Sequence, residues 1–343
     1  MSAPPIAIYG ASGHTGRLVA TDLHARGHAV ILAGRSEPKL KALADELPGA
    51  ETHPAGLDDP GALRELAGRA GVLIHCAGPF ETTGRPVASA AVEAGCHYVD
   101  HSLEQHHARW FFDTLDEPAR RRDLVMITAM SFYGGLGDLL AAAAAAGLAE
   151  VERVVTAYAV SGWRLTGGAR RTAELLFADT RRITYTDGAH HVGYVEPRNA
   201  VFPFPPPLGP RTMIAPIPSS DVVTIPRHVR TRQVEAQLTA ETFAEEGAFT
   251  SDDLPPEERA RSRFIVAVQA ITADGNNAAQ AGGHDLWRAS ALASVEAAVR
   301  LARGEGPEPG AHSPATAFPA EPFLRDLEAL GLFDLTLRKG ASR

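Results

Sequence analysis

The 343-residue sequence predicts an α/β protein: a doubly wound parallel sheet, followed by a second α+β domain with a mainly antiparallel or mixed sheet. Two observations carry this prediction. Over residues 1–147, short and continuously apolar runs alternate with amphipathic stretches, which is typical of βαβ units whose sheet is covered by helices on both faces. Over residues 148–283, long strands follow one another without regular helices between them. Residues 284–343 then form two helices that we expect to return to the first domain.

The elements of the first domain are predicted from apolar runs for the strands and from amphipathic stretches for the helices. The predicted strands cover residues 6–9, 29–33, 71–76, 97–100 and 124–128. The predicted helices cover residues 15–25, 37–47, 59–67 and 86–94. Asp58 or Asp59 would cap the third helix, and Pro60 suits its first turn because proline has no N–H to satisfy there.

The second domain and the C-terminal helices are predicted in the same way. The strands cover residues 151–160, 213–217, 233–239 and 264–272, and the helices cover residues 171–178, 284–303 and 321–330. Residues 183–188 and 192–195 resemble a hairpin with a loose turn. The segment from Pro203 to Pro210 contains five prolines in eight residues, so we expect a rigid exposed loop there.

Composition argues against several classes of protein. Lys and Arg number 33 against 41 Asp and Glu, so the net charge of −8 argues against binding nucleic acid or an anionic membrane. Only Cys76 and Cys96 are present, which favours a reducing compartment. The N-terminus lacks a leader-like stretch, and the alanine-rich residues 136–148 are too short to span a bilayer. We therefore expect a cytoplasmic protein with a small-molecule substrate, and a homodimer stays open.

A glycine-rich turn stands between the first predicted strand and the first predicted helix. It reads Gly10-Ala-Ser-Gly13-His-Thr-Gly16, a GxxGxxG pattern. Residues without Cβ let the backbone approach a pyrophosphate, and the N-terminus of the helix that follows offers free N–H groups. The context predicts a Rossmann-type dinucleotide site made by Gly10, Ser12, Gly13, His14, Thr15 and Gly16. A tight turn that merely closes a βα unit is the alternative.

The residues after the second predicted strand select the cofactor. NAD-binding folds usually carry an acidic residue here, which accepts a hydrogen bond from the ribose 2′-OH. This sequence instead has Arg35 and Ser36, with no carboxylate before Glu37. Arg35 can pair with a 2′-phosphate, and Ser36 can donate to the same group. NADP(H) is therefore the predicted cofactor, with a solvated Arg35 as the alternative.

Several segments together are similar to a known family. They are GASGHTGR at 10–17, LAGR at 32–35, CAGPF at 76–80, AGCHYVD at 94–100 and GDLLA at 137–141, with weaker likeness at 225–232 and 284–301. With these segments the sequence resembles the saccharopine dehydrogenase-like NADP-binding superfamily, especially its trans-acting enoyl reductase branch. The resemblance implies that Ala77, Gly78, Pro79 and Phe80 lie beside the ribose and nicotinamide. On physical grounds the Phe80 side chain can form a wall for the nicotinamide ring.

A reductase also needs a group that supplies a proton, because hydride delivery to an activated C=C or C=N bond leaves negative charge on the substrate. Tyr133, in a glycine-bordered loop after a predicted strand, is the first candidate for a catalytic residue, followed by Asp100 and His101. A helix cap or a loop carboxylate is the alternative role for Asp100. The sequence departs from the family pattern here, because Tyr133 and two glycines stand between Phe132 and Asp138.

The predicted substrate residues are Tyr98, Trp163, Arg164 and Arg171. The last three flank a Gly-Gly turn before a predicted helix, where a helix N-terminus and arginines can hold a carboxylate or phosphate. A structural loop with solvated arginines is the alternative. No metal site is predicted, since the adjacent pairs His106-His107 and His190-His191 have diverging side chains.

These features favour an NADP(H)-dependent oxidoreductase that reduces an activated C=C (enoyl) or C=N (imine) bond of a small metabolite or biosynthetic intermediate. The second domain is expected to carry the substrate site and any dimer contact. The alternative is a non-catalytic NADP(H)-binding sensor, because a dinucleotide turn binds its ligand whether or not chemistry follows.

Overall fold

The computed structural model describes residues 4–248 and 255–340, and these residues form two compact units. The described residues of the first unit lie within Met1–Ser102, His107–Ser131 and Ser290–His312. Those of the second unit lie within Leu103–His106, Phe132–Ala289 and Ser313–Arg343. This division differs from the three consecutive segments expected from the sequence, because the chain leaves and re-enters each unit.

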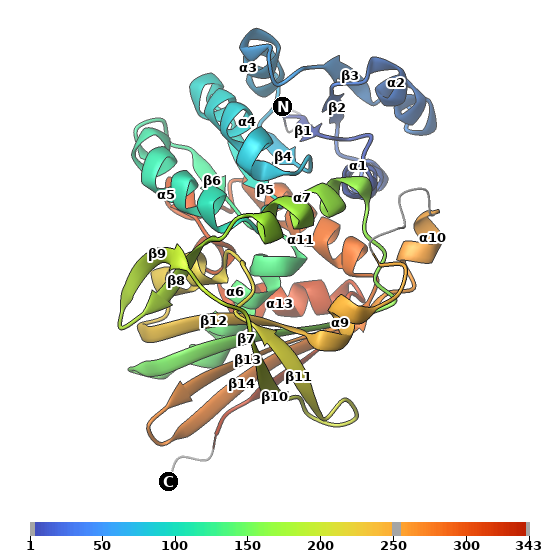
Figure 1. Ribbon diagram of the computed structural model, residues 1–343. Coiled ribbons are helices and arrows are strands. Elements are labelled where there is room, and N and C mark those ends of the chain that lie inside the picture. Colours follow the sequence, from blue (N-terminus) through green and yellow to red (C-terminus); the bar gives the residue numbers. More distant parts are fainter. Residues whose placement is uncertain (1–3, 249–254, 341–343) are drawn as a thin grey trace. The chain divides into compact units, whose positions relative to one another are not determined.

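The first unit is built on a parallel sheet of seven strands (Figure 1). In chain order they are β1 (Ile6–Tyr9), β2 (Val30–Gly34), β3 (Glu51–Pro54), β4 (Val72–His75), β5 (His97–Asp100), β6 (Val125–Ile127) and β15 (Gly310–His312). Across the sheet the order is β15-β6-β5-β4-β1-β2-β3, and every neighbouring pair is parallel. The strand order reverses between β1 and β4, as in doubly wound dinucleotide-binding folds. The predicted fold class is therefore confirmed for this unit.

The two edge strands of this sheet are not evident in the sequence. β3 reads Glu-Thr-His-Pro, with one buried residue of four, and β15 has only three residues. A strand with a single neighbour keeps much of its surface in water, so it needs no continuous apolar run. The sequence pattern therefore identifies the interior strands of the sheet and misses its edges.

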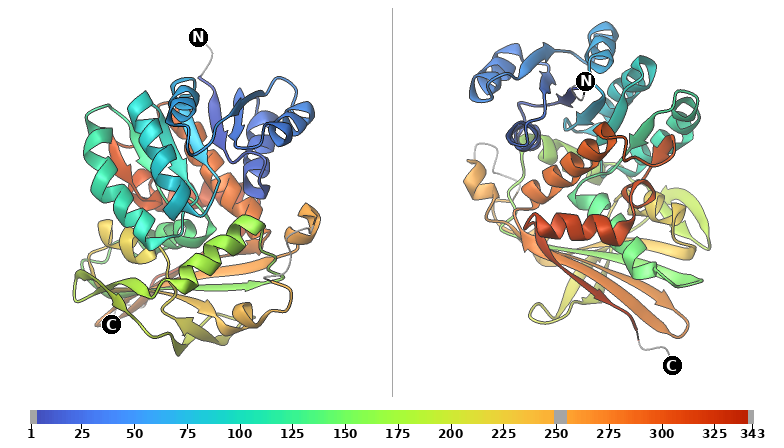
Figure 2. Two further views of the ribbon diagram at one scale, coloured as in Figure 1. Left: turned by 45° about the horizontal axis from the view of Figure 1, so that its top comes forward. Right: turned by 180° about the vertical axis from the view of Figure 1, so that it is seen from behind.

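Helices cover both faces of this sheet (Figure 2). They are α1 (His14–Ala25), α2 (Glu37–Glu46), α3 (Pro60–Gly68), α4 (Phe80–Ala94), most of α5 (Gln105–Arg120) and most of α11 (Leu286–Ala302). The Asp59 side chain accepts the Ala62 N–H at 2.9 Å, which confirms the predicted cap of α3. α4 begins at Phe80, well before the predicted start at residue 86, and α5 has no counterpart among the predicted elements.

The second unit is built on a mixed sheet of nine strands, which confirms the expected α+β class. In chain order they are β7 (Val151–Ser161), β8 (Arg181–Thr186), β9 (Ala189–Tyr194), β10 (Arg198–Pro203), β11 (Pro210–Ala215), β12 (Thr231–Thr239), β13 (Arg263–Thr272), β14 (Gly275–His284) and β16 (Phe333–Arg338). The main order is β10-β11-β12-β7-β13-β14-β16, and β8 pairs with β12 and β9. β14 escapes prediction because its residues are mostly small or polar.

The hairpin of β8 and β9 has a tighter turn than the sequence suggests. Thr186 pairs directly with Ala189, so only Asp187 and Gly188 connect the strands. Both have positive φ, +52° and +77°, which is the backbone of a two-residue hairpin turn. The expectation of a loose turn is therefore wrong, and the Asp-Gly dipeptide was its overlooked signal.

One face of the second sheet is covered by helices. α6 (Gly137–Ala145) contacts β7, β13, β14 and β16, and α13 (Ala320–Ala329) packs on α6 and β16. This position of α13 differs from the expectation that both C-terminal helices return to the first domain. A Cβ on Gly137 would overlap Tyr158 and Asp221, so the glycine lets α6 lie close to β7. The remaining helical segments are α7 (Gly167–Ala178), α8 (Asp221–Thr224), η2 (Ile225–Arg227), α9 (Ala240–Ala244), α10 (Pro256–Arg259) and α12 (Pro314–Ala317).

Candidate functional site

The glycine turn after β1 is held by its own backbone. The N–H groups of Gly10 and Ala11 donate to the Ala33 carbonyl oxygen at 2.8 and 3.1 Å, and the Gly13 N–H donates to the Gly10 carbonyl oxygen at 3.0 Å. Gly10 has a φ of +84°, a left-handed conformation that favours glycine. A Cβ on Gly16 would overlap the Gly10 carbonyl oxygen, so glycine lets α1 lie close behind the turn.

The turn leaves the N-terminus of α1 open. α1 begins at His14 after Gly13, no side chain caps it, and its first turn holds no acidic residue. Gly13 is exposed, and within the described residues a Cβ built on it would approach only the Gly10 carbonyl oxygen, at 3.3 Å. Uncapped N–H groups at the positive end of a helix dipole, with open space beside them, are what a phosphate requires. The predicted turn from Gly10 to Gly16 therefore fits the pyrophosphate of a dinucleotide.

Arg35 and Ser36 follow β2 directly. The Arg35 side chain is exposed and forms no ion pair or hydrogen bond with the described part of the chain. Ser36 is the N-cap residue of α2, yet its hydroxyl makes no capping hydrogen bond. An unpaired guanidinium beside an uncommitted hydroxyl suits a 2′-phosphate, which accepts hydrogen bonds from both. This placement agrees with the prediction of NADP(H).

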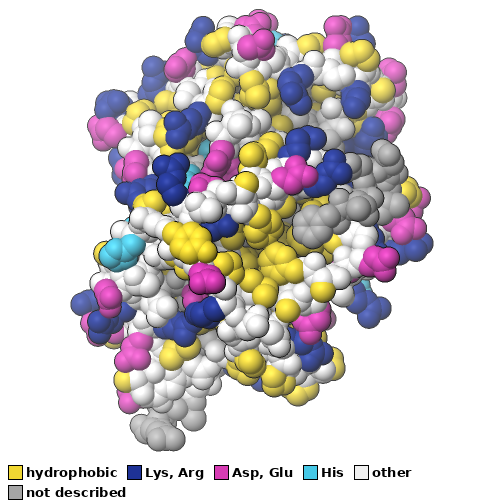
Figure 3. All heavy atoms as spheres, in the orientation of Figure 1, with side chains coloured by type: hydrophobic (Ala, Val, Ile, Leu, Met, Phe, Trp, Pro, Cys, Tyr) yellow, Lys and Arg dark blue, Asp and Glu magenta, His cyan; other side chains and the backbone are white. Residues whose placement is uncertain are grey.

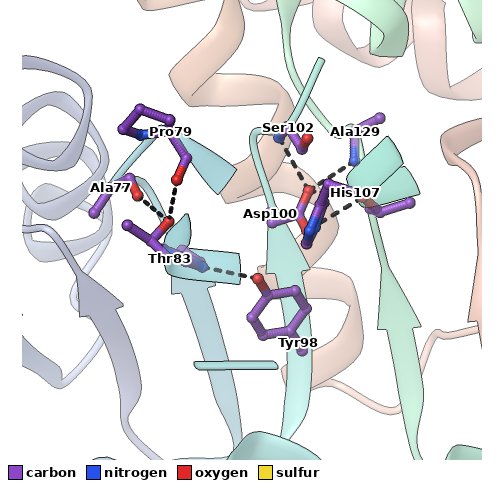
Figure 4. Close-up of polar contacts among 10 residues, drawn as sticks. Ala77, Pro79, Thr83, Tyr98, Asp100, Ser102, His107 and Ala129 are labelled. Atoms are coloured by element: carbon purple, nitrogen blue, oxygen red, sulfur yellow. Dashed lines mark hydrogen bonds and ion pairs between the residues drawn. The ribbon is translucent and has the colours of Figure 1, made fainter. Parts of the chain in front are cut away.

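The turn after β4 lies against the glycine turn. A Cβ on Gly10 would lie 2.8 Å from the Ala77 Cβ, so the two turns are in contact. The Thr83 hydroxyl lies 2.5 Å from the carbonyl oxygen of Ala77 and 3.0 Å from that of Pro79 (Figure 4). Thr83 therefore holds the backbone of Ala77, Gly78 and Pro79 from inside α4. The carboxyl ends of β1, β2 and β4 thus present one continuous backbone surface, where ligands of open α/β sheets bind.

Two aromatic residues predicted for the site are core residues instead. The Phe80 side chain is 5% exposed, and its ring centroid lies 4.8 Å from that of His75 and 5.7 Å from that of His107. Tyr98 is fully buried, with its hydroxyl 2.8 Å from His75 Nδ1, and burial and the nearby Asp100 raise the pKa of Tyr98. The structure thus packs both rings in the interior of the first unit.

Asp100, at the end of β5, is fully buried among donors (Figure 4). Its carboxylate accepts hydrogen bonds from the N–H groups of Ser102 and Ala129 at 3.0 and 2.9 Å, from Thr128 Oγ1 at 2.9 Å and from His107 Nε2 at 2.8 Å. Burial raises the pKa of Asp100, but His107 and the two N–H donors lower it to a net value below the ordinary one. This geometry favours the loop-carboxylate interpretation, because Asp100 joins β5, α5 and the turn after β6.

Both ring nitrogens of His101 are also hydrogen-bonded within the protein. Its Nε2 lies 2.8 Å from Ser294 Oγ, and its Nδ1 lies 3.2 Å from Ser290 Oγ. Because the Ser294 hydroxyl donates to the Ala291 carbonyl oxygen, its oxygen accepts from His101 Nε2–H, and Ser290 donates to Nδ1. Burial lowers the pKa of His101 to about 4, so the ring is neutral at pH 7. The predicted acid–base residue thus anchors α11 to the end of β5.

Tyr133 belongs to the second unit and lies on a turn between β6 and α6. The segment η1 (Phe132–Leu136) contains Gly134 at a φ of +83°, and the Gly134 N–H donates to the Tyr158 hydroxyl at 3.0 Å. The Tyr133 ring centroid lies 4.9 Å from that of Tyr158 and 6.1 Å from that of Trp163. Burial raises the pKa of Tyr133, so its phenol stays protonated at neutral pH. The structure therefore brings together Tyr133 and Trp163, which the sequence assigns to separate roles.

Asp221 supports this turn, and no sequence pattern points to it. Its carboxylate accepts hydrogen bonds from the Ser219 hydroxyl and, at 3.1 Å, from the Tyr158 hydroxyl. Burial raises the pKa of Asp221 to about 6, although the two hydroxyl donors lower it. A chain of hydrogen bonds thus runs from Asp221 through Tyr158 to the Gly134 backbone beside Tyr133.

A second buried pair of the second unit is formed by Asp138 and His228. His228 Nε2 lies 2.7 Å from Asp138 Oδ1, and the Ala315 N–H donates to Asp138 Oδ2 at 2.9 Å. Burial raises the pKa of Asp138, but His228 and the Ala315 N–H lower it to a net value below the ordinary one. Both residues stand in segments that carry the resemblance, 137–141 and 225–232, so a signal was present. The pair is separated by 90 residues, and only the fold joins them.

The two predicted arginines have different environments. Arg164 donates to the Glu245 carboxylate at 2.7 Å, so its charge is neutralised inside the protein. Arg171, on α7, is exposed and forms no ion pair within the described residues. The N-terminus of α7 is capped by Thr166, whose hydroxyl accepts the Ala169 N–H at 3.1 Å. Arg164 thus fits the structural alternative, and Arg171 is the cation left for an anionic ligand.

The second unit also exposes apolar side chains. Among the described residues, the large hydrophobic side chains that are exposed are Leu175, Phe177, Val192, Tyr194 and Val201. Figure 3 shows hydrophobic side chains gathered beside α7. The Phe177 ring lies 5.5 Å from that of Phe243 on α9, measured between centroids. No helix within the described ranges is both long and apolar enough to cross a bilayer.

Comparison with known proteins agrees with this geometry. The open helix N-terminus and the unpaired Arg35 define a dinucleotide-binding domain that accepts a 2′-phosphate. Residues 6–166 match the family described as the saccharopine dehydrogenase NADP binding domain. This region of the chain is therefore similar to NADP-binding domains of the saccharopine dehydrogenase type. The match confirms the resemblance and the NADP(H) prediction made from the sequence.

Curated relatives match about two fifths of the chain. The trans-acting enoyl reductase of Mycobacterium ulcerans (strain Agy99) is 33% identical over 140 residues, which cover 39% of this chain and 34% of that protein. The lipid droplet localized protein of Caenorhabditis elegans is 30% identical over 151 residues, which cover 40% of this chain and 35% of that protein. The matched region thus spans about a third of the length of these relatives.

A solved structure has the fold of the whole chain. Apo saccharopine dehydrogenase (L-Glu forming) from Saccharomyces cerevisiae superposes with a TM-score of 0.68 and covers 98% of this chain and 100% of its own. The sequence identity is 12%, so the likeness concerns the fold alone. It supports the pairing of a doubly wound unit with a second unit built on a mixed sheet.

Proposed function

We propose that the protein is an NADP(H)-dependent oxidoreductase that reduces an activated C=C or C=N bond of a small molecule. The observation that carries the proposal is the open N-terminus of α1 together with the unpaired Arg35. Relatives that match 39% of this chain bear the name trans-acting enoyl reductase, and the structure that shares the whole fold is a saccharopine dehydrogenase. Both names describe redox enzymes, which supports redox chemistry in this chain.

Each part of the cofactor has a set of residues in the first unit. The uncapped N-terminus of α1 would hold the pyrophosphate, and Arg35 with Ser36 would hold the 2′-phosphate. The backbone from Ala77 to Pro79 would face the ribose. Bound NADPH supplies the hydride. The chain itself must therefore bind and orient the cofactor and provide a proton.

Tyr133 is the proposed proton donor. Its buried phenol holds a proton at neutral pH, and the turn that carries it is fixed by Tyr158 and Asp221. Tyr133→Phe removes only the hydroxyl, so turnover should fall on the order of 10²- to 10⁴-fold while NADPH affinity is unchanged. Tyr194→Phe, at an exposed tyrosine of the same unit, is the matched control. Unchanged turnover of Tyr133→Phe would remove this residue from the reaction.

Cofactor choice tests the binding half of the proposal. Arg35→Ala should weaken NADPH binding about 10- to 100-fold in a fluorescence titration and leave NADH binding unchanged, because a charge-assisted contact is worth about 1.5–3 kcal/mol. Arg303→Ala removes another exposed arginine of the first unit and should change neither affinity. Equal weakening of both cofactors by Arg35→Ala would contradict the assignment.

A non-catalytic NADP(H) sensor is the second candidate. One observation favours it: Tyr98, Asp100 and His101, the polar residues after the middle strands, are all engaged by protein partners. A panel of enoyl and imine compounds with NADPH, followed at its absorbance maximum, distinguishes the two functions. Consumption of NADPH with any of them supports the reductase, whereas tight binding with no consumption across the panel supports the sensor.

Cellular location and assembly remain proposals. Cys76 and Cys96 are both unpaired, which is compatible with the reducing cytoplasm that we propose as the location. We also propose that the chain forms a homodimer through the second unit. Light scattering of the purified chain would decide the oligomeric state.

A further inference from the structure

Two cavities of the second unit join along one face of its sheet. The larger has a volume of about 750 Å³ and the smaller about 330 Å³, and Gln280 and Thr336 line both. The strand register puts Gln280 beside Ala267 on β13 and beside Thr336 on β16. Because side chains alternate along a strand, Ile265, Ala267 and Gln269 then share this face. The two cavities therefore form one groove, which we call the β14 groove.

The proline-rich connection between β10 and β11 covers the β14 groove. Pro207 and Leu208 line the larger cavity, and Pro203 and Pro205 line the smaller one. The sequence predicted a rigid exposed loop here, but Phe204 is only 3% exposed. Proline stiffness and the buried aromatic ring hold this cover over the sheet.

The groove is elongated. Its lining on β14 runs from Asn276 to His284, and nine residues of strand span about 30 Å at roughly 3.3 Å per residue. Both cavity volumes lie in the range of ligand pockets, about 300–1,000 Å³. The shape suits a long, narrow molecule more than a compact one.

The two ends of the groove differ in charge. The smaller cavity is lined by Arg338 and Lys339 and by no acidic residue, and neither cation forms an ion pair within the described residues. Its floor is apolar, with Ala267, Ala278 and Phe202. A cationic end above an apolar floor complements an anionic head on a hydrocarbon chain.

The larger cavity is suited to the chain of such a molecule. Leu208, Ile265 and Leu332 contribute apolar surface, and the charge of Arg211 is matched by Glu241 at 3.9 Å. The cavity is also lined by one further cation, Arg263, and by the carboxylates of Glu328 and Asp334, so its charges are mixed in sign, unlike those of the smaller cavity. Where the cavities meet, the Gln280 side chain makes no hydrogen bond within the described residues, and its Oε1 is buried. This acceptor could take a hydrogen bond from a polar substituent on the chain.

We propose that the β14 groove binds an elongated amphipathic carboxylate, such as a medium- or long-chain fatty acid. The carboxylate lies at Arg338 and Lys339, and the chain runs along β14 beneath the proline-rich connection. A single flexible chain fits a groove that runs between the sheet and this connection. This site lies wholly in the second unit and does not rest on the oxidoreductase proposal.

The test is a fluorescence titration of the full chain with 11-(dansylamino)undecanoic acid. We expect saturable binding with one site per chain and displacement by unlabelled dodecanoic acid. The double variant Arg338→Ala/Lys339→Ala should weaken binding about 10- to 100-fold, because it removes the charge-assisted contacts. Ala278→Trp should abolish binding by filling the floor. Arg288→Ala removes an exposed arginine outside the groove and should leave the affinity unchanged.

Three results would overturn the proposal. The first is absence of saturable binding to the unmodified chain. The second is equal affinity for all variants, or equal affinity for the dansyl acid and its methyl ester. The third is a dimer that Ala278→Trp converts to a monomer in light scattering, which would assign this face to a second copy. Thermal unfolding of each variant shows that a loss of binding does not come from a loss of fold.

Discussion

Asp100 in the first unit and Asp221 in the second are both fully buried carboxylates, yet their pKa values shift in opposite directions. Asp100 accepts from two backbone N–H groups, a threonine hydroxyl and His107, and its pKa is lowered. Asp221 accepts hydroxyl hydrogens from Ser219 and Tyr158 and a hydrogen bond from its own backbone N–H, yet burial, with Asp138 nearby, raises its pKa to about 6. The number and kind of donors therefore decide which buried carboxylate remains ionised.

The two buried carboxylates also have different roles. Asp100 is ionised at every physiological pH, so it acts as a permanent joint between strands and helices. Asp221 titrates close to neutral pH, beneath the turn that carries Tyr133. The first arrangement stabilises the fold, and the second couples the geometry around a candidate reaction residue to pH.

The largest expected effect on stability comes from removing the Asp100 carboxylate. Asp100→Ala leaves His107 and the Ala129 N–H buried without their partner, and Ala129 has a left-handed φ of +61° that this bond helps to hold. The free energy of unfolding should fall by about 3–5 kcal/mol. Urea unfolding followed by circular dichroism measures it. Asp113→Ala, at an exposed aspartate of α5, should change stability by less than about 0.5 kcal/mol. A loss below about 1 kcal/mol for Asp100→Ala would show that the joint is not needed.

The next effect is a pH dependence with an unusual sign. Because the folded pKa of Asp221, about 6, exceeds its ordinary value of 3.8, the folded state binds an extra proton between pH 3.8 and pH 6. Stability from this group is therefore present below pH 4 and is lost as pH rises to about 6, by roughly 3 kcal/mol in total. Asp221→Asn should remove this loss in urea unfolding at pH 4.5, 6 and 8. The exposed Asp187→Asn, whose positive φ suits asparagine, is the control. An unchanged pH profile in Asp221→Asn would contradict the raised pKa.

The smallest effect concerns neutral hydrogen bonds at the same strand end as Asp100. Ser294→Ala removes the acceptor of His101 Nε2–H, and both groups are buried. Stability should fall by about 1 kcal/mol, the usual value for a neutral hydrogen bond. Urea unfolding of Ser294→Ala and of Asp100→Ala, measured side by side, gives the ratio of the two losses in the free energy of unfolding. A larger loss of stability for Ser294→Ala than for Asp100→Ala would show that the contact with α11, and not Asp100, mainly holds this strand end.

Local patterns in the sequence identified the parts that depend on neighbouring residues. β1, β2 and β4 are buried on both faces, so their apolar runs stand out. The turn from Gly10 to Gly16 consists of consecutive residues, and so does the Arg35-Ser36 pair. Each can therefore be recognised from the sequence before the fold is known. The edge strand β3 is polar, and β14 consists of small and polar residues, so neither has an apolar run to find.

The polar pairs were harder to find. The side chains of His106 and His107 diverge: His106 Nε2 contacts the Arg181 carbonyl oxygen, and His107 Nε2 contacts Asp100. Adjacency in sequence indicates that two rings diverge but not which partner each ring meets. The position of Tyr98 at the end of a predicted strand indicates a place in the cleft, yet its side chain is fully buried.

The sequence by itself determined the doubly wound class of the first unit, the dinucleotide turn and the choice of NADP(H), since each depends on residues within one βα unit. The tertiary structure decided which polar side chains are free. Asp100, His101 and Arg164 resemble candidate site residues in sequence, but the fold pairs each with a distant partner. The Asp138–His228 pair and the β14 groove likewise join residues from separate elements. A buried polar group must find a partner wherever the packed chain supplies one, and that choice depends on distances that no local pattern records.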